Sequence, residues 1–475
     1  MKKIYALTFS LIFSIMVSNA TTWLVGASHT YIKPSQVSSL VQNGDTVAID
    51  AGTYTADVCS WNKNNLVLKG VGGLAHLDAN NTSYGRKGIW VISGNDVTVQ
   101  NMEFSNCHDV AALDQNWAGI RMEGINLTVN NCYFHDNDDG ILESNIATSN
   151  IVITYTEFNH NGWGDGYSHN LYIGHCSSLT FSYNYSHMAH IGHELKSRAT
   201  TNYVLYNRFS NETGDASLEV SFPNGGLAVV MGNMIEQGPN SQNSGIVDYG
   251  SEGNTNPIPR ELYLVNNTIV DDRSAGTFVQ YGTGASLLKA YNNLITGPGT
   301  AFNGTATTVD TSKNLIIPNK ANAGLVDVTN FDYHLLSSAI AINKGVSAGT
   351  TLEAFNLTPA YEYVHKTNKA GRITNGAIDI GAYEYSSATG IENISPAIEF
   401  YVYSDVNDNS INLFFTNLQA DKDVYIYDMT GKLMLSKERV ASAKISFSRS
   451  SFAPGIYVVQ AKVGNSVVSK KFVVQ

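Results

Sequence analysis

Short apolar segments recur along the middle of this chain, and their spacing limits its fold more than any other feature. Successive segments begin 21 to 32 residues apart, counted between their first large apolar residues. A period of roughly 20 to 35 residues, with two or three short β segments in each repeat and no helical stripe, is typical of a solenoid. The first apolar residues of the segments, which we term anchors, are Ile89, Ile120, Ile141, Leu171, Leu195, Leu218, Ile246 and Phe278.

The solenoid that suits this pattern is a right-handed parallel β-helix, in which every coil pairs its strands with those of the coil before. The anchors then form an apolar ladder inside the coils. Asn-containing segments such as VLYNRF (204–209) and LVNNTI (264–269) predict a second ladder, of hydrogen-bonded amides at the turns. Repeats of 23 or 24 residues are too short for a β-sandwich each, and a propeller blade needs about 40. We therefore predict an all-β fold with a parallel β-helix over 21–385, closed by a cap at KPSQVSSLV (33–41).

The first twenty residues, MKKIYALTFSLIFSIMVSNA, have the pattern of a cleavable secretory signal. Lys2 and Lys3 precede an apolar run, and Ser18 and Ala20 supply the small residues that a signal peptidase recognises. No later segment reaches the roughly 20 continuous apolar residues of a membrane-spanning helix. We expect residues 1–20 to be removed and the mature protein to be secreted, without a membrane span.

Composition favours strands and turns over helices and excludes one class of partner. Charged residues are 15% of the chain, against roughly 25% in ordinary globular domains. The formal net charge of -11 argues against nucleic acid, so an anionic ligand would need a local basic patch. Four cysteines are few for so long a secreted chain. We therefore predict no disulfide, and we expect a monomer held together by its size.

The pattern changes after residue 385. SSATGIENISP begins a linker that we place at 386–395, and residues 396–475 predict a small antiparallel β-sandwich that follows the β-helix. Gly-containing pairs at Thr430-Gly431 and Gly464-Asn465 predict the turns of two hairpins.

Three motifs of this sandwich resemble the C-terminal sorting domain of bacterial type IX secretion substrates. They are VYIYDMTGKLML (424–435), APGIYVV (453–459) and SKKFVV (469–474). The resemblance implies a bacterium with two membranes, and export through the outer one with the type IX secretion machinery as a partner. The protein would then be extracellular or held at the cell surface.

The positions just after the anchors predict which side chains point outward, because neighbours along a strand alternate between its two sides. In HIGHELKSRAT (190–200), Glu194, Lys196 and Arg198 would share one face. Rings stack on sugars and guanidinium groups take carboxylates through two bonds, so such a face suits an acidic polysaccharide. A plainer interpretation stays open, in which the charges only neutralise one another on a solvated surface. The residues that we predict to bind substrate on this face are Trp90, Arg121, Glu123, Glu219 and Tyr249.

Cleavage of an acidic polysaccharide by β-elimination needs a cation for the uronate carboxylate, a base for the α proton and a donor for the leaving oxygen. We predict that Lys196 or Arg198 neutralises the carboxylate or takes the proton, since a like charge beside a lysine lowers its pKa. Tyr172, or one of the nearby His169 and His193, would protonate the leaving oxygen.

The stretch ELKSRATTNYVLYNRF (194–209) resembles the β-helical polysaccharide lyases, a class that includes pectate, alginate and chondroitin lyases. The alginate and chondroitin enzymes use a lysine base and an arginine on nearby coils. Lys196 and Arg198 match these residue types on a single coil. The resemblance therefore implies a lyase acting on a uronate-containing polysaccharide.

Two alternatives remain open from the sequence. SHNLYIG (168–174), with Asp138 and Asp139 about a coil earlier, more weakly resembles polygalacturonase-like inverting hydrolases. Those enzymes need two or three carboxylates about 6.5–9.5 Å apart. The other alternative is a non-catalytic glycan-binding or adhesin β-helix, which would keep the aromatic and cationic face but need no base.

Histidines and aspartates leave metal binding open without assigning a ligand. Six of the twelve histidines lie within residues 160–193, including an H-x-x-H-x-x-H run at 187–193. Histidines three residues apart converge on one face when they lie on a helix, whereas the sequence predicts a loop entering a strand here. The acidic loop DNDDG (136–140) would suit either Ca²⁺ or Asx turns. We predict no certain cofactor and leave a Ca²⁺ site open.

Overall fold

The computed structural model describes residues 20–386, 399–405, 410–416, 421–442, 444–463 and 466–474. The predicted signal peptide apart from Ala20, nearly all of the predicted linker and the predicted turn at Gly464-Asn465 lie outside these residues. The chain divides into two compact units, of which the first ends at Tyr385 and the second begins at Ser386.

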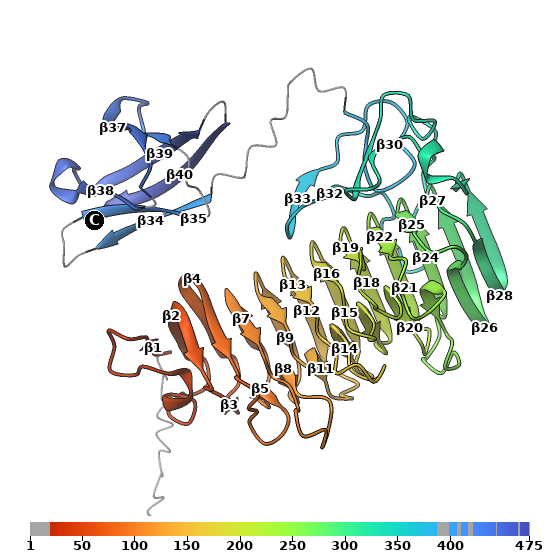
Figure 1. Cartoon of the computed structure of the whole chain (residues 1–475), viewed down its shortest axis with the longest axis horizontal. Coiled ribbons are helices and arrows are strands. Elements are labelled where there is room, and N and C mark those ends of the chain that lie inside the picture. The colour runs from red at the N-terminus through yellow and green to blue at the C-terminus, as the bar shows by residue number, and fades with distance from the viewer. Residues whose placement is uncertain are drawn as a thin grey trace, which may run out of the picture. The chain divides into compact units, whose positions relative to one another are not determined.

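The first unit is a right-handed parallel β-helix whose coils stack along one axis (Figure 1). Its strand pairings are parallel and join each coil to the next on three faces, which we call sheets I, II and III. Sheet I consists of β3 (Cys59–Trp61), β5 (Gly88–Ile92), β8 (Ala118–Met122), β11 (Asp139–Glu143), β14 (Leu171–Ile173), β17 (Leu195–Ser197), β20 (Val220–Phe222), β23 (Gly245–Tyr249) and the first parts of β26 (Thr277–Tyr291) and β28 (Thr300–Ser312).

The other two sheets share the long strands at both ends of the stack, whose first and second parts belong to different faces. Sheet II consists of β1 (Thr22–Val25), the first parts of β2 (Thr46–Thr55) and β4 (Val67–Asp78), β6 (Val97–Gln100), β9 (Leu127–Asn130), β12 (Asn150–Thr154), β15 (Ser178–Ser182), β18 (Thr201–Leu205), β21 (Leu227–Met231), β24 (Glu261–Val265) and the second parts of β26 and β28. Sheet III consists of the second parts of β2 and β4, β7 (Met102–Ser105), β10 (Tyr133–His135), β13 (Glu157–Asn159), β16 (Tyr185–His187), β19 (Arg208–Ser210), β22 (Met234–Gln237), β25 (Thr268–Asp271), β27 (Leu294–Thr296) and β29 (Leu315–Ile317).

The interior of the β-helix is filled by side chains that repeat from coil to coil. Phenylalanines form a continuous column, in which neighbouring ring centroids are 4.9 to 6.0 Å apart. Burying one such ring contributes roughly 1.5–3 kcal/mol, so the column is a large part of what holds the coils together. The four cysteines, all within residues 20–386, are buried and free. The rings of the column are Phe104, Phe134, Phe158, Phe181 and Phe209.

The predicted asparagine ladder is confirmed between sheets II and III. Each side-chain amide nitrogen donates to the amide oxygen of the next ladder residue, over 2.8 to 3.2 Å, and to a backbone carbonyl. A buried amide without these partners would cost about 1–3 kcal/mol, so the ladder fixes the spacing and alignment of the coils. Its members are Asn184, Asn207, Asn233, Asn267, Asn293 and Asn314.

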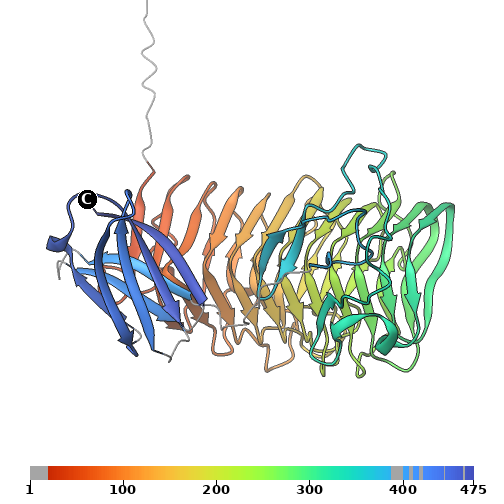
Figure 2. The ribbon, with the colours of Figure 1, turned by 90° about the horizontal axis from the view of Figure 1, so that it is seen from above.

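The chain before the coils caps the start of the stack, whereas the chain after the coils packs on its side. The predicted cap contains a single 3₁₀ turn, η1 (Pro34–Gln36), after which Val37 and Val41 are buried in the core. At the other end the chain turns back after β29 and runs along the outside of the coils (Figure 2). Its apolar side chains pack on sheets II and III. This returning segment contains η2 (Lys320–Asn322), the hairpin of β30 (Leu325–Asp327) and β31 (Asp332–Leu335), and the hairpin of β32 (Tyr361–Val364) and β33 (Asn368–Gly371).

The second unit is a small antiparallel β-sandwich, as predicted. One sheet has the order β34-β35-β38 and the other β37-β36-β39-β40, and side chains from both form one core. The predicted turn at Thr430-Gly431 joins β36 to β37, where the Gly431 amide donates to the Asp428 carbonyl. Among the described residues, no helix is long and apolar enough to cross a membrane. The elements are β34 (Glu399–Asp405), β35 (Ser410–Thr416), β36 (Lys422–Asp428), β37 (Leu433–Val440), β38 (Lys444–Ser448), η3 (Arg449–Ser451), β39 (Gly455–Val463) and β40 (Ser466–Val474).

The ladder predicts a large effect for one buried amide. Asn233 accepts from the backbone and side chain of Asn207 and donates to Asn267 and to the Val204 carbonyl. Asn233→Ala removes these bonds and should lower the free energy of unfolding by about 3 kcal/mol. The measurement is urea denaturation followed by circular dichroism. The control is Asn150→Ala, whose amide pairs at the surface, and its effect should stay within about 0.5 kcal/mol. Equal losses in the two variants would contradict this account of the ladder.

Candidate active site

The strand register of sheet I decides which side chains face outward, and it differs from the predicted alignment at four coils. Trp90 pairs with Ile120, and Leu195 pairs with Val220, which pairs in turn with Val247. Val279 pairs with Val247 in the same way. The interior positions that we assigned to Ile89, Leu218, Ile246 and Phe278 are therefore held by Trp90, Val220, Val247 and Val279. The outward column of sheet I is Val91, Arg121, Leu142, Tyr172, Lys196, Ser221, Asp248 and Gln280.

Three of the predicted substrate contacts are consequently wrong. Trp90 has no exposed surface and packs edge-on against Trp61 and Phe104 inside the coils. Tyr249 is also fully buried, and its hydroxyl donates to the Gly226 carbonyl over 2.6 Å. Glu219 is fully buried, and burial beside other carboxylates raises its pKa. A register shift of one residue moves a side chain from one side of the strand to the other, which explains the errors at Trp90 and Tyr249. Glu219 lies in a bend just before β20, so strand alternation does not place its side chain.

Three of the predicted catalytic residues do lie together on the outer side of sheet I. Tyr172 on β14 pairs in register with Lys196 on β17, and Arg198 follows two residues later on the same side. The Lys196 ammonium lies 5.3 Å from the centre of the Tyr172 ring. Arg198 Nε donates to the Tyr172 hydroxyl over 2.8 Å. Two cations and a phenol thus occupy two adjacent coils. Glu194, by contrast, is fully buried and does not share this face.

Two loop residues complete the cluster, and the sequence did not identify them as site residues. Glu252, in the loop after β23, places one carboxylate oxygen 3.5 Å from Lys196 Nζ and the other 2.7 Å from Arg198 Nη1. Asn224, in the loop after β20, accepts from Arg198 Nη1 over 2.5 Å. Its amide is oriented by a 2.9 Å hydrogen bond to Thr255. The glycines of SFPNGG (221–226) and YGSEG (249–253) are typical of turns, but they do not indicate which side chain reaches back to the sheet.

The two predicted histidines lie beside this cluster and are neutral. Their rings stack 4.6 Å apart, and each Nδ1 accepts from a backbone amide, of His193 for His169 and of Leu218 for His193. Burial beside Lys196 lowers the pKa of His193 to about 3 and that of His169 well below its usual range. Each ring therefore carries its proton on Nε2. His169 is fully buried against Tyr172, so it supports that ring instead of reaching a ligand.

Burial and neighbouring charges shift the pKa values of several ionisable groups in the cluster. Burial lowers the pKa of Lys196, Arg198 lowers it further, and Glu252 opposes the shift. The hydrogen bond from Arg198 lowers the pKa of Glu252, which keeps that carboxylate ionised. Burial raises the pKa of Asp248, whose carboxylate accepts from the hydroxyls of Ser221 and Ser251. Lys196 is thus closer to losing its proton than an ordinary surface lysine.

Arg121 and Glu123 lie on the same face, towards the start of the stack. Leu142 separates Arg121 from Tyr172 in the outward column, which puts them two coil spacings, or roughly 10 Å, apart. Glu123 is bonded to Lys87 over 2.5 Å and lies 3.9 Å from Arg121. Arg121 is therefore partly neutralised but still on the line along which a long ligand would cross the coils.

The histidine run at 187–193 does not converge on one point. His187 Nε2 lies 3.1 Å from Glu157, and His190 Nδ1 lies 3.1 Å from Asp215. His193 lies beside the cluster on sheet I, so the three rings contact three different sets of partners.

The aspartates that resembled a hydrolase pair are buried. Asp138 accepts from the backbone amides of Asp109 and Trp117, and Asp139 accepts from that of His169. Neither side chain is exposed, and burial raises the pKa of each. These carboxylates hold loops in place and do not face the outward column.

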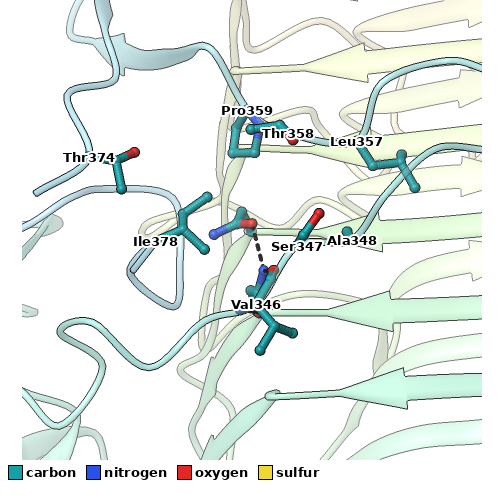
Figure 3. A pocket seen from close by; sticks show the side chains of 10 residues that line it. Val346, Ser347, Ala348, Leu357, Thr358, Pro359, Thr374 and Ile378 are labelled. Atoms are coloured by element: carbon teal, nitrogen blue, oxygen red, sulfur yellow. Dashed lines mark hydrogen bonds between the residues drawn. The ribbon is translucent and has the colours of Figure 1, made fainter. Parts of the chain in front are cut away.

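A cavity of about 240 Å³ lies elsewhere, between the returning segment and two coil turns (Figure 3). Asn292 at its wall exchanges hydrogen bonds with the backbone of Val346. The ten described residues that line it, among them Leu357, Pro359 and Ile378, include no ionisable side chain. The lining therefore offers hydroxyls and amides but no acid or base that could activate them.

Comparison with known proteins agrees with both units. Residues 56–185 match the family model described as the right handed beta helix region, and residues 407–475 match that of the secretion system C-terminal sorting domain. The protein is a secreted β-helix protein. Its sorting domain directs type IX secretion to the cell surface or the extracellular space.

One solved structure with a similar fold is that of the pectate lyase Pel9A. Its sequence is 12% identical to that of this chain. The structural match has a TM-score of 0.48 and covers 78% of this chain and 97% of the pectate lyase chain. No curated protein matches the chain.

The corrected position of Trp90 can be tested by stability. Trp90→Ala should lower the free energy of unfolding by about 3–5 kcal/mol, because it leaves a large void between Trp61 and Phe104. Arg121→Ala, on the outer side of the neighbouring coil, should change it by less than about 1 kcal/mol. The measurement is chemical denaturation of both variants beside the parent chain. A Trp90→Ala variant as stable as the parent would show that the ring lies outside the coils.

Proposed function

We propose that the protein binds a uronate-containing polysaccharide along the outer side of sheet I and cleaves it by β-elimination at the cluster of Tyr172, Lys196 and Arg198. The observation that carries the proposal is the convergence of both cations on one carboxylate group, that of Glu252.

Glu252 shows what the two cations can hold. Its oxygens are divided between Lys196 and Arg198, which is the arrangement that a uronate carboxylate would need. The two cations are fixed on the sheet, with only 12% and 15% of their side chains exposed, whereas 47% of the Glu252 side chain is exposed on its loop. A substrate carboxylate would displace the loop carboxylate without disturbing the strands.

The chemistry follows from the state of each group. Arg198 stays charged and would stabilise the negative charge that grows on the carboxylate when the α proton leaves. Lys196, whose pKa is lowered, would take that proton as a neutral amine. The electron pair of the broken carbon–hydrogen bond forms the new double bond, and the bond from the β carbon to the glycosidic oxygen breaks.

The leaving oxygen needs a proton, and two groups are placed to give it. The Tyr172 hydroxyl accepts from Arg198, so its own proton points elsewhere and is free to be donated. His193 carries a proton on Nε2 in its neutral form. We assign the donor role to Tyr172, because it lies in register with the proposed base. Arg121 would bind a sugar carboxylate further along the chain.

Removing the proposed base should abolish cleavage. Lys196→Ala should reduce kcat by a factor of about 10²–10⁴, the usual contribution of a general base. The measurement is the ultraviolet absorbance of unsaturated uronate during incubation with alginate, pectate and glycosaminoglycans. The matched control is Lys289→Ala, since Lys289 also lies over a tyrosine ring and near a carboxylate, but on sheet II. Its activity should equal that of the parent.

The same assay separates the other functions. New reducing ends without the absorbance would identify a hydrolase, and retention on the polymer with neither change would identify a binding protein. Turnover of the Lys196→Ala variant at the parent rate, with intact circular dichroism, would remove Lys196 from the mechanism.

Glu252→Gln should shift the pH dependence of cleavage. Glu252 raises the pKa of Lys196, so its neutralisation should lower that pKa and move the acidic limb of kcat/KM to lower pH, by about one unit. KM should also fall, because no loop carboxylate then competes with the substrate. The control is Glu123→Gln, on the same face but bonded to Lys87, which should leave the limb in place. A limb that moves to higher pH would exclude Lys196 as the base.

A further inference from the structure

Sheet III carries a second cluster of chemically active side chains, on the outer side of three early coils. His76 on β4 pairs in register with Glu103 on β7, and Ser105, two residues later, pairs with His135 on β10. Glu103 therefore has one histidine directly beside it and the other diagonally across the next coil. All three side chains are partly exposed, by 23%, 23% and 17% for His76, Glu103 and His135.

The donor atoms of this cluster converge. A Glu103 carboxylate oxygen lies 3.7 Å from His76 Nε2 and 3.1 Å from His135 Nε2, and all three donor atoms lie within 4.8 Å of one another. Ligands about 2.1 Å from a tetrahedral ion are about 3.4 Å apart, which falls between the two observed distances. Among the described residues, this is the one set of three such side chains whose donor atoms meet in this way.

A neighbouring carboxylate holds one of the histidines in the orientation that a metal needs. Asp136 lies 2.7 Å from His135 Nδ1 and 2.8 Å from His160 Nδ1. A proton on His135 Nδ1, shared with Asp136, leaves the lone pair of Nε2 directed at Glu103. Histidines that bind metals usually have this kind of carboxylate partner on the other ring nitrogen.

The next carboxylate along sheet III is already occupied. Glu157 accepts from Lys366 of the returning segment over 2.7 Å and lies 3.1 Å from His187. It is therefore neutralised by its own partners and is not available as a fourth ligand. On the other side, Ser105 Oγ lies 2.7 Å from His76 Nε2, and an ion on that nitrogen would replace this hydrogen bond.

We propose that His76, Glu103 and His135 form a binding site for a divalent transition metal, with Zn²⁺ the ion that best suits the ligands. Two imidazole nitrogens and one carboxylate are a ligand set that zinc uses when a fourth position is left to water or another ligand. Ca²⁺ prefers six to eight oxygen ligands, so this set disfavours it. Because the three side chains are partly exposed, the fourth coordination position of the ion would face solvent. The site lies on a different sheet from the Lys196 cluster and does not depend on the proposed lyase reaction.

The test is metal binding by the chain purified without a histidine tag and freed of metal by a chelator. Isothermal titration with ZnCl₂ should show one site, and titration with Co²⁺ should give the intense visible absorption of a four-coordinate ion. Glu103→Gln and His135→Ala should each weaken Zn²⁺ binding by at least a hundredfold. Asp136→Asn changes a residue that contacts His135 but is not one of the three proposed ligands, and it should weaken Zn²⁺ binding by about 10–100-fold.

The control is His175→Ala, an exposed histidine after β14 that should leave the titration unchanged. Circular dichroism of each variant shows that the coils are intact. The proposal is overturned if the parent chain takes up no Zn²⁺, or if Glu103→Gln and His135→Ala bind it as tightly as the parent does. CaCl₂ in place of ZnCl₂ should give no heat, and equal binding of the two ions would also contradict the proposal.

Discussion

Coil-to-coil register is the constraint on which the rest of the structure depends. Parallel pairing places each residue beside its counterpart about 4.8 Å away on the next coil, so functional groups far apart in the sequence become neighbours. The buried asparagine ladder and the phenylalanine column fix this register from inside. Both proposed sites follow from it: Tyr172 lies beside Lys196 on sheet I, and His76 lies beside Glu103 on sheet III.

The sequence predicted the architecture well because the repeat is a property of the whole coil. Apolar residues every 21 to 32 positions, together with recurring asparagines, are sufficient to indicate stacked coils and their ladder. The site was predicted only where the register was unambiguous. Leu195 and Ser197 lie inward on either side of Lys196, so the lysine had to face outward. In GIWVI both Ile89 and Trp90 are apolar, and the pattern could not decide between them.

The rest of the site could not be predicted, because it comes from loops. Glu252 and Asn224 reach the cluster through turns whose path depends on tertiary packing, and no periodicity places such residues. The histidine and carboxylate set on sheet III was missed for another reason. Its members, His76, Glu103 and His135, are separated by 27 and 32 residues in the sequence, whereas local spacing drew attention to the run at 187–193. Aligning the coils on all three sheets would have placed these three residues beside one another.

The returning segment changes what kind of solenoid this is. Its Ala360 amide donates to the Tyr206 hydroxyl, 154 residues away, and Lys366 bonds to Glu157 on a still earlier coil. In a simple repeat array each coil contacts only its neighbours, and the ends can unfold one coil at a time. Here the returning segment crosses several coils and ties the middle of the stack to its far end, so those coils should separate together. Because this segment follows the coils in the sequence, their packing is completed only after the last coil has formed.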